Sequence, residues 1–418
     1  MLSKNGNRML AYVQEIKDVE PLYLCKKDDN GNFVPDLDKE GNKQYADSIE
    51  KAHILGWTII IKKGEFKPGD KCVFFEIDSK VPSARFLDAT GQDVFGFLLK
   101  KNYCIKTYKL NKFGIWSQGL ALPLSSFNLS TDLPLNEDLT EKLGVVYAVS
   151  EDNRRKKSSA ELATRQFKSK HLKFFNNKLV LKLMRYKFFR DLCTLPAKKE
   201  IKIKAFPSAF VNHTDEERIQ NMPWMLENKE PFIATEKIDG TSTTWLLVRK
   251  PFGKFEFYVC SRNIRIPRKI AETTENVYWE NALKYDAENQ LKSYLKKHKE
   301  LKWVCIQGES YGEDLQGNPL KMKGHHFAAF NFIDSKKGRW GSIEAKDELS
   351  KWKTPIPWVP ILNTNFILPD TVEELLKIAT AKSVVNKDVL REGIVFRSKD
   401  GKTSFKAVSP EYLERHNL

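Results

Sequence analysis

The chain has 418 residues, 41% of them hydrophobic, and a formal net charge of +16. This length and composition exclude a disordered chain and predict two or three globular domains. The charge indicates a polyanionic partner, such as a nucleic acid, a phosphorylated substrate or an acidic membrane surface.

The cysteines and the N-terminus indicate an intracellular protein. None of the six cysteines forms a C-x-x-C pair, and in a chain this long they do not make a disulfide framework. Charged residues interrupt the first 20 positions, and no apolar run approaches the roughly 20 residues that span a bilayer. We expect a soluble cytoplasmic or nuclear protein without membrane contact, with an organelle or a viral setting left open.

Residues 1–150 are predicted to be mostly β and to form a small barrel or sandwich. Residues 57–61 (WTIII) and 71–77 (KCVFFEI) are rich in β-branched and aromatic residues, as strands are. Residues 62–70 contain the Gly and Pro of a hairpin connection. Residues 26–45, with two Gly-Asn pairs, resemble a polar hairpin insertion rather than a calcium loop. Further strand candidates are residues 105–110 and 119–124.

Residues 151–205 form a basic segment between two domains. The stretch 154–204 holds 17 Lys or Arg and three acids, and so carries almost all of the surplus charge. Leu and Phe recur in it at loosely helical spacing. Three interpretations are open: a solvated linker helix, an arm that contacts phosphates, and a basic amphipathic helix on an anionic membrane.

Residues 206–418 are predicted to combine strands and helices. Residues 275–300 form one expected helix, with lysines at its C-terminal end as the helix dipole favours. A second helix follows Thr371, which stands three residues before Glu374 as in a capping box. The strand candidates are 231–237, 255–261, 303–309, 326–333, 392–398 and 403–408.

Charged residues recur at the ends of these strands. Lys237 and Glu309 each end a strand, and Glu392 begins one. Lys406 lies alone among apolar residues in the last strand candidate. Because buried charges are costly unless paired, this pattern predicts either an internal ion-pair network or a charged ligand between the strands.

Six stretches within residues 214–410 resemble, in order, the motifs of the covalent nucleotidyltransferases, the family of RNA ligases, DNA ligases and capping enzymes. They are EKIDG, SRN, IQGE, FAAFNF, REGIVF and SFKAVS. Any one of them is weak, but six in order with sensible gaps are specific.

The resemblance implies a covalent mechanism. Lys237 would attack the α-phosphate of ATP, so its pKa should be depressed from about 10.4 by burial or by a neighbouring cation. Lys406 would stabilise the charge that gathers on that phosphate. Asp239 and Glu392 would hold Mg²⁺ or Mn²⁺, directly or through water. The glycine after Asp239, Gly240, would let the turn approach the nucleotide closely.

The remaining implied residues contact the nucleotide. Glu309 would bind the ribose hydroxyls, while Phe330 and Val395 would cover the two faces of the purine. Arg262 would meet a phosphate of the RNA end. The other implied nucleotide contacts are those of Glu236 and Arg218.

The order of the domains resembles the RNA-ligase branch of this family. Only twelve residues follow Lys406, which leaves no room for the C-terminal OB domain of DNA ligases and capping enzymes. The N-terminal stretches resemble an OB domain instead. The implied α+β architecture is an OB-like β-barrel over 1–150, a basic segment over 151–205, and an ATP-grasp-like nucleotidyltransferase domain of antiparallel sheets over 206–418. Many relatives have a second motif lysine where this chain has Val408.

The implied function is the ATP-dependent joining of RNA ends. The partners are ATP and RNA, most simply a nicked duplex, and the expected state is a monomer. Two alternatives are another nucleotidyltransferase (a capping guanylyltransferase or a DNA ligase) and a non-catalytic RNA-binding protein on the same fold.

Overall fold

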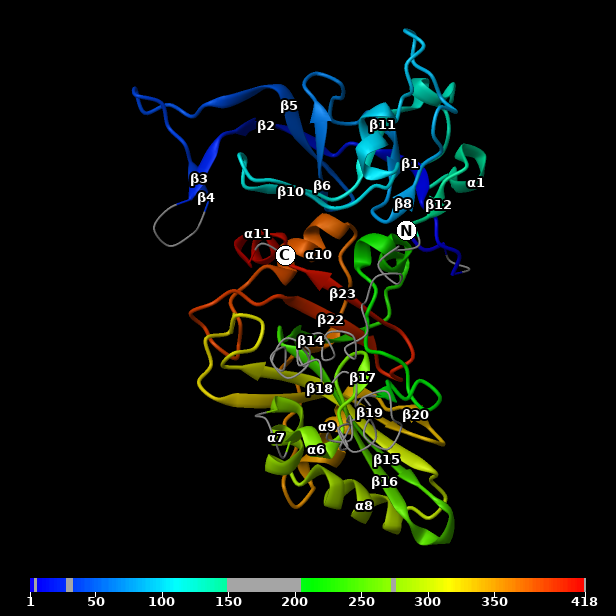
Figure 1. Ribbon diagram of the computed structural model, residues 1–418, viewed down its shortest axis with the longest axis vertical. Helices are drawn as coiled ribbons and strands as arrows, with labels where there is room; N and C mark the ends of the chain where they lie inside the picture. Colours follow the sequence, from blue (N-terminus) through cyan, green and yellow to red (C-terminus); the bar gives the residue numbers. More distant parts are fainter. Residues whose placement is uncertain (4–5, 28–32, 149–203, 272–275, 417–418) are drawn as a thin grey trace, which may run out of the picture. The chain divides into compact units, whose positions relative to one another are not determined.

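The computed structural model describes residues 1–3, 6–27, 33–148, 204–271 and 276–416 (Figure 1). The basic segment 154–204 lies outside these residues apart from Lys204, and its three interpretations stay predictions. Within the described part of the chain, no helix is both long and apolar enough to cross a membrane.

The N-terminal part is built from short antiparallel strands. They are β1 (Ala11–Glu15), β2 (Asp18–Tyr23), β3 (Cys25–Lys27), β4 (Phe33–Pro35), β5 (Tyr45–Ile54), β6 (Trp57–Lys62), β7 (Lys71–Phe75), β8 (Ser79–Lys80), β9 (Tyr108–Leu110), β10 (Ile115–Ser117), β11 (Leu120–Pro123) and β12 (Val146–Tyr147). The helices are α1 (Thr140–Leu143) and the short 3-10 helices Gly96–Lys101 and Leu124–Phe127. The pair of β3 with β4 agrees with the predicted hairpin insertion.

The sheet β1-β7-β11 carries two hydrophobic cores, one on each face. Val73 and Phe75 of β7 pack into one core, and Cys72 and Phe74 pack into the other. This follows from the alternation of side chains along a strand. It explains why residues 72–75 (CVFF) are an uninterrupted apolar run rather than an alternating one.

The predicted hairpin between residues 57–61 and 71–77 is wrong. Both segments are strands, but β6 belongs to the sheet β2-β5-β6 and β7 pairs with β1 and β11. The tight turn lies instead between β5 and β6, where Leu55 and Gly56 have φ values of 48° and 70°. The Gly and Pro of residues 62–70 therefore redirect the chain from one sheet to another.

The C-terminal part holds two larger sheets. Its strands are β13 (Lys204–Ala205), β14 (Phe232–Lys237), β15 (Thr241–Arg249), β16 (Phe255–Cys260), β17 (Ile264–Arg265), β18 (Trp303–Gly312), β19 (His325–Asp334), β20 (Gly338–Arg339), β21 (Ile361–Phe366), β22 (Gly393–Ser398) and β23 (Ser404–Val408). Its helices are α6 (Arg268–Ala271), α7 (Val277–Lys284), α8 (Ala287–Lys297), α9 (Ser342–Ser350), α10 (Val372–Ala379) and α11 (Pro410–His416). Three short 3-10 helices add to these: Ile219–Asn221, Pro223–Glu227 and Pro251–Gly253.

The larger sheet has the strand order β13-β17-β16-β15-β18-β19-β20. Helices α7, α8 and α9 pack on one face of it, over a core that includes Trp245, Leu291 and Phe332 (Figure 1). All of the strand pairs in this sheet are antiparallel among the described residues, as the predicted α+β class requires.

The single helix predicted over 275–300 is two helices. Asn276 caps α7 by accepting a hydrogen bond from the backbone N–H of Trp279. The helix stops because Asp286 has a left-handed backbone, with φ 47°. Helix α8 begins at the next residue. The second predicted helix is α10, and Thr371 caps it by accepting from the N–H of Glu374, as expected.

The smaller sheet, β21-β14-β22-β23, separates a core from a polar surface. Its apolar face packs against α10, and Phe396 and Phe405 are fully buried there. The period of two along a strand places their neighbours on the opposite face. That opposite face carries Lys237 of β14, Arg397 of β22 and Lys406 of β23, whereas Glu236 of β14 lies on the face that packs against α10.

Candidate active site

A cavity of about 300 Å³ is lined by residues of both C-terminal sheets. Ligand pockets are typically about 300–1,000 Å³, so a mononucleotide is a reasonable occupant. Of the ten residues predicted from the sequence, eight line it: Glu236, Lys237, Asp239, Arg262, Glu309, Phe330, Val395 and Lys406. Glu392 lies behind Lys237, and Arg218 pairs with Lys406 through a backbone bridge.

Lys237, which lines the cavity, forms an ion pair with Glu392. The Nζ of Lys237 donates to Oε2 of Glu392 at 2.6 Å. Lys237 ends β14 opposite Gly393 of β22, so strand pairing brings the two motifs together although 155 residues separate them. The side chain of Lys237 is 25% exposed and that of Glu392 is 12% exposed.

Burial and Lys406 alone do not depress the pKa of Lys237, and its depression by a divalent metal stays a prediction. Burial does act to lower this pKa, but the carboxylates of Glu392, Glu309 and Asp239 act more strongly together and raise it. Lys237 is therefore protonated at neutral pH unless other positive charge enters the site. The predicted depression considered burial and cations, whereas the three carboxylates that raise the pKa of Lys237 were not considered.

The pKa values of two carboxylic acids at this site are also raised. Burial raises the pKa of Glu309 to about 8, against the attraction of Lys237 and with the help of Glu392 and Asp239. Burial also raises the pKa of Glu392, which Lys237 only partly offsets. A surplus of buried negative charge of this kind fits a divalent cation, which would neutralise it.

The carboxylates are too widely spaced to surround an ion by themselves. In the described part of the chain, one group of His, Cys, Asp or Glu residues has all its ligand atoms within 4.8 Å of one another, and it is Asp18, Glu20 and His53 of the N-terminal part. Asp239 accepts a hydrogen bond from the hydroxyl of Tyr412 at 2.7 Å. Asp239 and Glu392 therefore fit an ion held partly through water, as expected for magnesium.

Two further cationic side chains, Lys406 and Arg262, line the cavity. Lys406 lies on β23 and is 18% exposed, and burial lowers its pKa, helped by the charges of Lys237 and Arg218. Arg262 follows β16 and is 57% exposed. Both contact one carboxylate, that of Asp215: Oδ1 lies 3.2 Å from Lys406 Nζ and Oδ2 lies 2.7 Å from Arg262 Nη2.

The wall expected to hold the purine is formed by Phe330 of β19 and Val395 of β22. Both side chains line the cavity, and Val395 is 8% exposed. Val395 pairs with Lys406 across the β22–β23 ladder, so the apolar wall and this lysine are set side by side. The guanidinium of Arg397 lies 5.7 Å from the centre of the Phe330 ring.

Glu236 and Glu309 differ in their surroundings. Glu236 is 1% exposed, and its carboxylate accepts from the hydroxyl of Ser383 and from the N–H of Val384 at 2.8 Å. It therefore fixes the segment after α10 against β14. Glu309 of β18 lies opposite Ser242 of β15, and its side chain is half-buried in the cavity wall.

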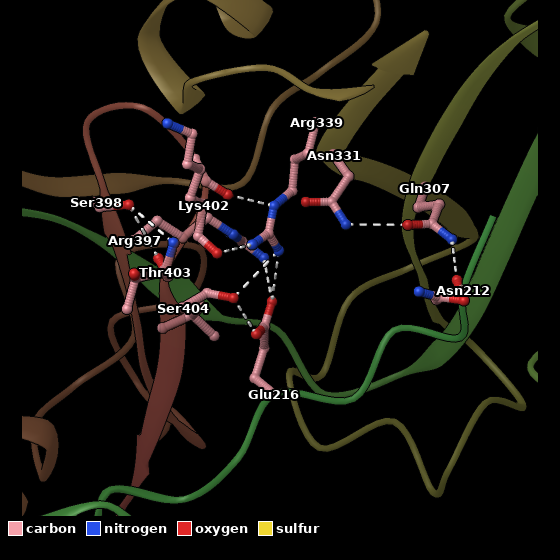
Figure 2. Close-up of polar contacts among 12 residues, drawn as sticks. Asn212, Glu216, Gln307, Asn331, Arg339, Arg397, Ser398, Lys402, Thr403 and Ser404 are labelled. Carbon is pink, nitrogen blue, oxygen red and sulfur yellow. Dashed lines mark hydrogen bonds and ion pairs between the residues drawn. The ribbon is translucent and has the colours of Figure 1, made fainter. Parts of the chain in front are cut away.

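A charged cluster that the sequence analysis did not assign lies beside the cavity (Figure 2). Glu216 accepts from Arg397 Nη2 at 3.1 Å and from the hydroxyl of Ser404, and it lies 3.6 Å from Arg339 Nη1. Arg397 is 3% exposed, and its Nε and Nη1 atoms have no partner among the described residues. The signal was present in the sequence: like Lys406, Arg397 is a lone cation among the apolar residues of a strand.

Gly240 lines the cavity, so its predicted approach to the nucleotide stays a prediction, and the structure gives it a second role. A Cβ atom at this position would lie 2.3 Å from the carbonyl oxygen of Ser310 on β18. The glycine thus allows the turn after β14 to approach the neighbouring sheet. This close approach brings Asp239 towards the cavity.

The C-terminal domain thus has two antiparallel sheets whose residues line a cavity that contains Lys237. Residues 230–408 match the RNA ligase family, and residues 40–124 match an OB-fold domain family described as PHA02142 OB-fold domain. The chain therefore contains an RNA ligase domain and an N-terminal OB-fold domain, as its motifs predicted.

Solved structures of the Naegleria gruberi RNA ligase are similar over nearly the whole chain. A lysine variant of that ligase with AMP and manganese is 29% identical, covers 98% of this chain and 99% of its own, and has a TM-score of 0.56. The same ligase with pyrophosphate is 29% identical with equal coverage and a TM-score of 0.55. An arginine variant with ATP and manganese has a TM-score of 0.54 at the same identity and coverage. Among curated proteins, no sequence matches this chain significantly.

Proposed function

We propose that the chain joins RNA 3′-hydroxyl and 5′-phosphate ends at the expense of ATP, through a covalent adduct of AMP with Lys237. The observation that carries this proposal is the position of Lys237, 2.6 Å from Glu392 and in the same cavity as Glu309 and Lys406. The similar Naegleria ligase has been solved with ATP, with pyrophosphate and with AMP, which are the reactant of such a first step, the product it releases and the product of the last step.

The first step is an exchange at the α-phosphate of ATP. The neutral amine of Lys237 attacks phosphorus, a proton leaves the amine, and the bond to the β-phosphate breaks to release pyrophosphate. Lys406 stabilises the negative charge that gathers on the α-phosphate. Arg218, which pairs with the backbone of Lys406, and Glu236, which fixes the end of β14, complete the nucleotide contacts in this proposal.

The nucleoside binds on the opposite side of the cavity. Phe330 and Val395 cover the adenine, and Glu309 accepts hydrogen bonds from the ribose hydroxyls. With a pKa of about 8, Glu309 can also donate one at neutral pH. Arg262, the most exposed of the lining cations, receives the 5′-phosphate of the RNA.

Asp239 and Glu392 hold the divalent cation, Mg²⁺ or Mn²⁺, in this proposal. When bound, the metal would supply positive charge that offsets the three carboxylates and lowers the pKa of Lys237. Asp239 is kept in position by the hydroxyl of Tyr412.

The second and third steps complete the ligation. The 5′-phosphate of RNA attacks the adduct, the bond between Lys237 and phosphorus breaks, and a pyrophosphate-linked end forms. A 3′-hydroxyl then attacks that end and AMP leaves. We propose a nicked duplex as the substrate and a monomer as the active form, with an OB-like domain over 1–150, a basic segment over 151–205 and the ligase domain over 206–418.

The test is transfer of label from ATP to the protein. The full-length chain is incubated with ATP labelled at the α-phosphate and with magnesium, and then separated on a denaturing gel. We expect a labelled band at about 48.4 kDa that is lost in Lys237→Ala and kept in Lys402→Ala, a strongly exposed lysine near the end of β22. Absence of label in the wild type would falsify the proposal, and label from GTP alone would indicate a capping enzyme.

A further inference from the structure

Asp215 contacts both of the cations that the proposed function assigns to phosphates. Its carboxylate bridges Lys406 Nζ and Arg262 Nη2, at 3.2 Å and 2.7 Å. Asp215 also lines the cavity, and the proposed function does not use it. A phosphate group that binds the same two cations must take the position of this carboxylate or share it.

The backbone that carries Asp215 is held on both sides. Before it, the Thr214 hydroxyl is hydrogen-bonded to that of Ser242 at 2.9 Å, and Gln307 donates to the carbonyl of Asn212 at 3.0 Å. After it, the Lys406 N–H donates to the carbonyl of Glu217 at 2.8 Å. The backbone of residues 212–217 is therefore fixed to β15, β18 and β23.

Glu216 adds the strongest attachment of this segment (Figure 2). Its carboxylate accepts hydrogen bonds from Arg397 and from the Ser404 hydroxyl, and it forms an ion pair with Arg339. Because Glu216 points to this cluster, its neighbour Asp215 is directed to the cavity. Asp215 can thus leave the two cations only by rotation of its own side chain.

We propose that Asp215 is an internal competitor of phosphate groups for two cations: of the nucleotide phosphate at Lys406 and of the RNA 5′-phosphate at Arg262. The inference rests on the proposed function, because that function assigns these cations to phosphates. The carboxylate keeps both side chains pointing at the cavity, and it weakens the binding of every ligand that carries phosphate there. Release of pyrophosphate, and later of AMP, is easier because a carboxylate is at hand to replace them.

The expected effect is moderate. Asp215 is 56% exposed, and exposed ion pairs are worth little individually. Loss of the two pairs, together with loss of repulsion towards phosphate, should strengthen phosphate binding by about three- to tenfold. A group that merely supports the structure would weaken binding on removal, so the sign of the change separates the two roles.

The test measures equilibrium binding with Asp215→Asn in the full-length chain. Lys237→Ala is the background, so that nucleotide binds without reacting. The ligands are ATP and pyrophosphate with magnesium, and adenosine, which lacks phosphate. We expect ATP and pyrophosphate to bind about three- to tenfold more tightly and adenosine to bind unchanged.

Asp370→Asn is the matched control. Asp370 also pairs with one lysine, at 2.7 Å from Lys229 Nζ, but it is 89% exposed and does not line the cavity. Its substitution removes the same charge and should leave all three affinities unchanged. Asp215→Ser repeats the loss of charge with a smaller side chain and should give the same gain as Asp215→Asn.

Unchanged or weaker binding of ATP and pyrophosphate in both Asp215 variants would overturn the inference. So would a gain that extends to adenosine. The proposed function fails on a different result, the absence of label on the wild-type chain. The two outcomes are independent because the binding experiment involves no covalent step.

Discussion

The carboxylates around Lys237 favour its protonated form, in which an amine is not nucleophilic. Glu392, Glu309 and Asp239 together raise its pKa, although burial opposes them. The same arrangement raises the pKa of two of its carboxylates. Such a site lowers the stability of the folded chain, and it lowers this stability less when a cation binds.

Glu309 should therefore destabilise the folded chain at alkaline pH. Its folded-state pKa is about 8, above the ordinary value of 4.5, so the folded protein keeps a proton that the unfolded chain releases. The stability contributed by that proton is present below pH 4.5 and is lost as pH rises towards 8. In metal-free buffer, Glu309→Gln should raise the free energy of unfolding at pH 8 by roughly 1–3 kcal/mol, measured by urea denaturation.

Two comparisons support this assignment. The gain of Glu309→Gln should shrink at pH 5, where the wild-type carboxyl is also neutral. Glu288→Gln, which removes an exposed carboxylate paired with Arg268, should change stability by no more than about 0.5 kcal/mol at either pH. An equal gain at both values of pH would show that packing, and not charge, is responsible.

At the scale of elements, the Glu216 cluster connects three parts of the domain. Arg339 follows β19 in the larger sheet, and Arg397 and Ser404 belong to β22 and β23 in the smaller one. Arg339 also donates to the carbonyls of Gly401 and Lys402, at 2.6 Å and 3.2 Å, in the turn between β22 and β23. The cluster thus fixes the strand that carries Lys406 against the opposite wall of the cavity.

Removal of Glu216 should be costly because it leaves Arg397 buried without its counter-ion. Arg397 is 3% exposed, and breaking one partner from a buried ion pair typically costs about 3–5 kcal/mol. Glu216→Ala should lower stability by about 3 kcal/mol in urea denaturation and raise the KM for ATP. Glu216→Gln should lose less, because its amide oxygen can still accept from Ser404 and Arg397.

The double variant Glu216→Ala, Arg397→Met distinguishes this cause from a simple loss of packing. If the unpaired charge is responsible, the second substitution should recover part of the lost stability. Additive losses in the two substitutions would instead indicate that the cluster contributes through its contacts alone.

Six strands of the ligase domain were predictable because their signal is local, whereas β15 and β21 were missed. Each of the six strand candidates there coincides with a strand, and the charges at their ends lead to the cavity. The helix break at Asp286 and the partners of β7 were not predictable, since a left-handed aspartate and a non-local pairing leave no local pattern. Asp215 and Glu216 were missed for a similar reason: their meaning depends on Lys406, Arg262 and Arg397, which are distant in sequence.

For the whole molecule, charge is the property that remains to be explained. Residues 154–204 hold 17 Lys or Arg and three acids, whereas the rest of the chain is almost neutral. If these residues contact RNA phosphates, RNA binding should weaken steeply with salt, because each neutralised phosphate adds about 0.7–0.9 to the slope of log K against log salt. Neutral substitutions of Lys and Arg over 154–173 should lower both the affinity and the slope, while transfer of AMP to Lys237 stays intact.

A control with similar chemistry is available on α8 and after it. Lys296, Lys297 and Lys299 are exposed, so their change to Gln should lower the slope little if RNA binding depends on position and not on net charge alone. A slope that is unchanged by substitutions in 154–173 would favour the solvated linker. If anionic vesicles rather than salt-sensitive RNA respond to these substitutions, the segment acts as a membrane-binding helix. The three interpretations of the segment thus predict three different responses to the same substitutions.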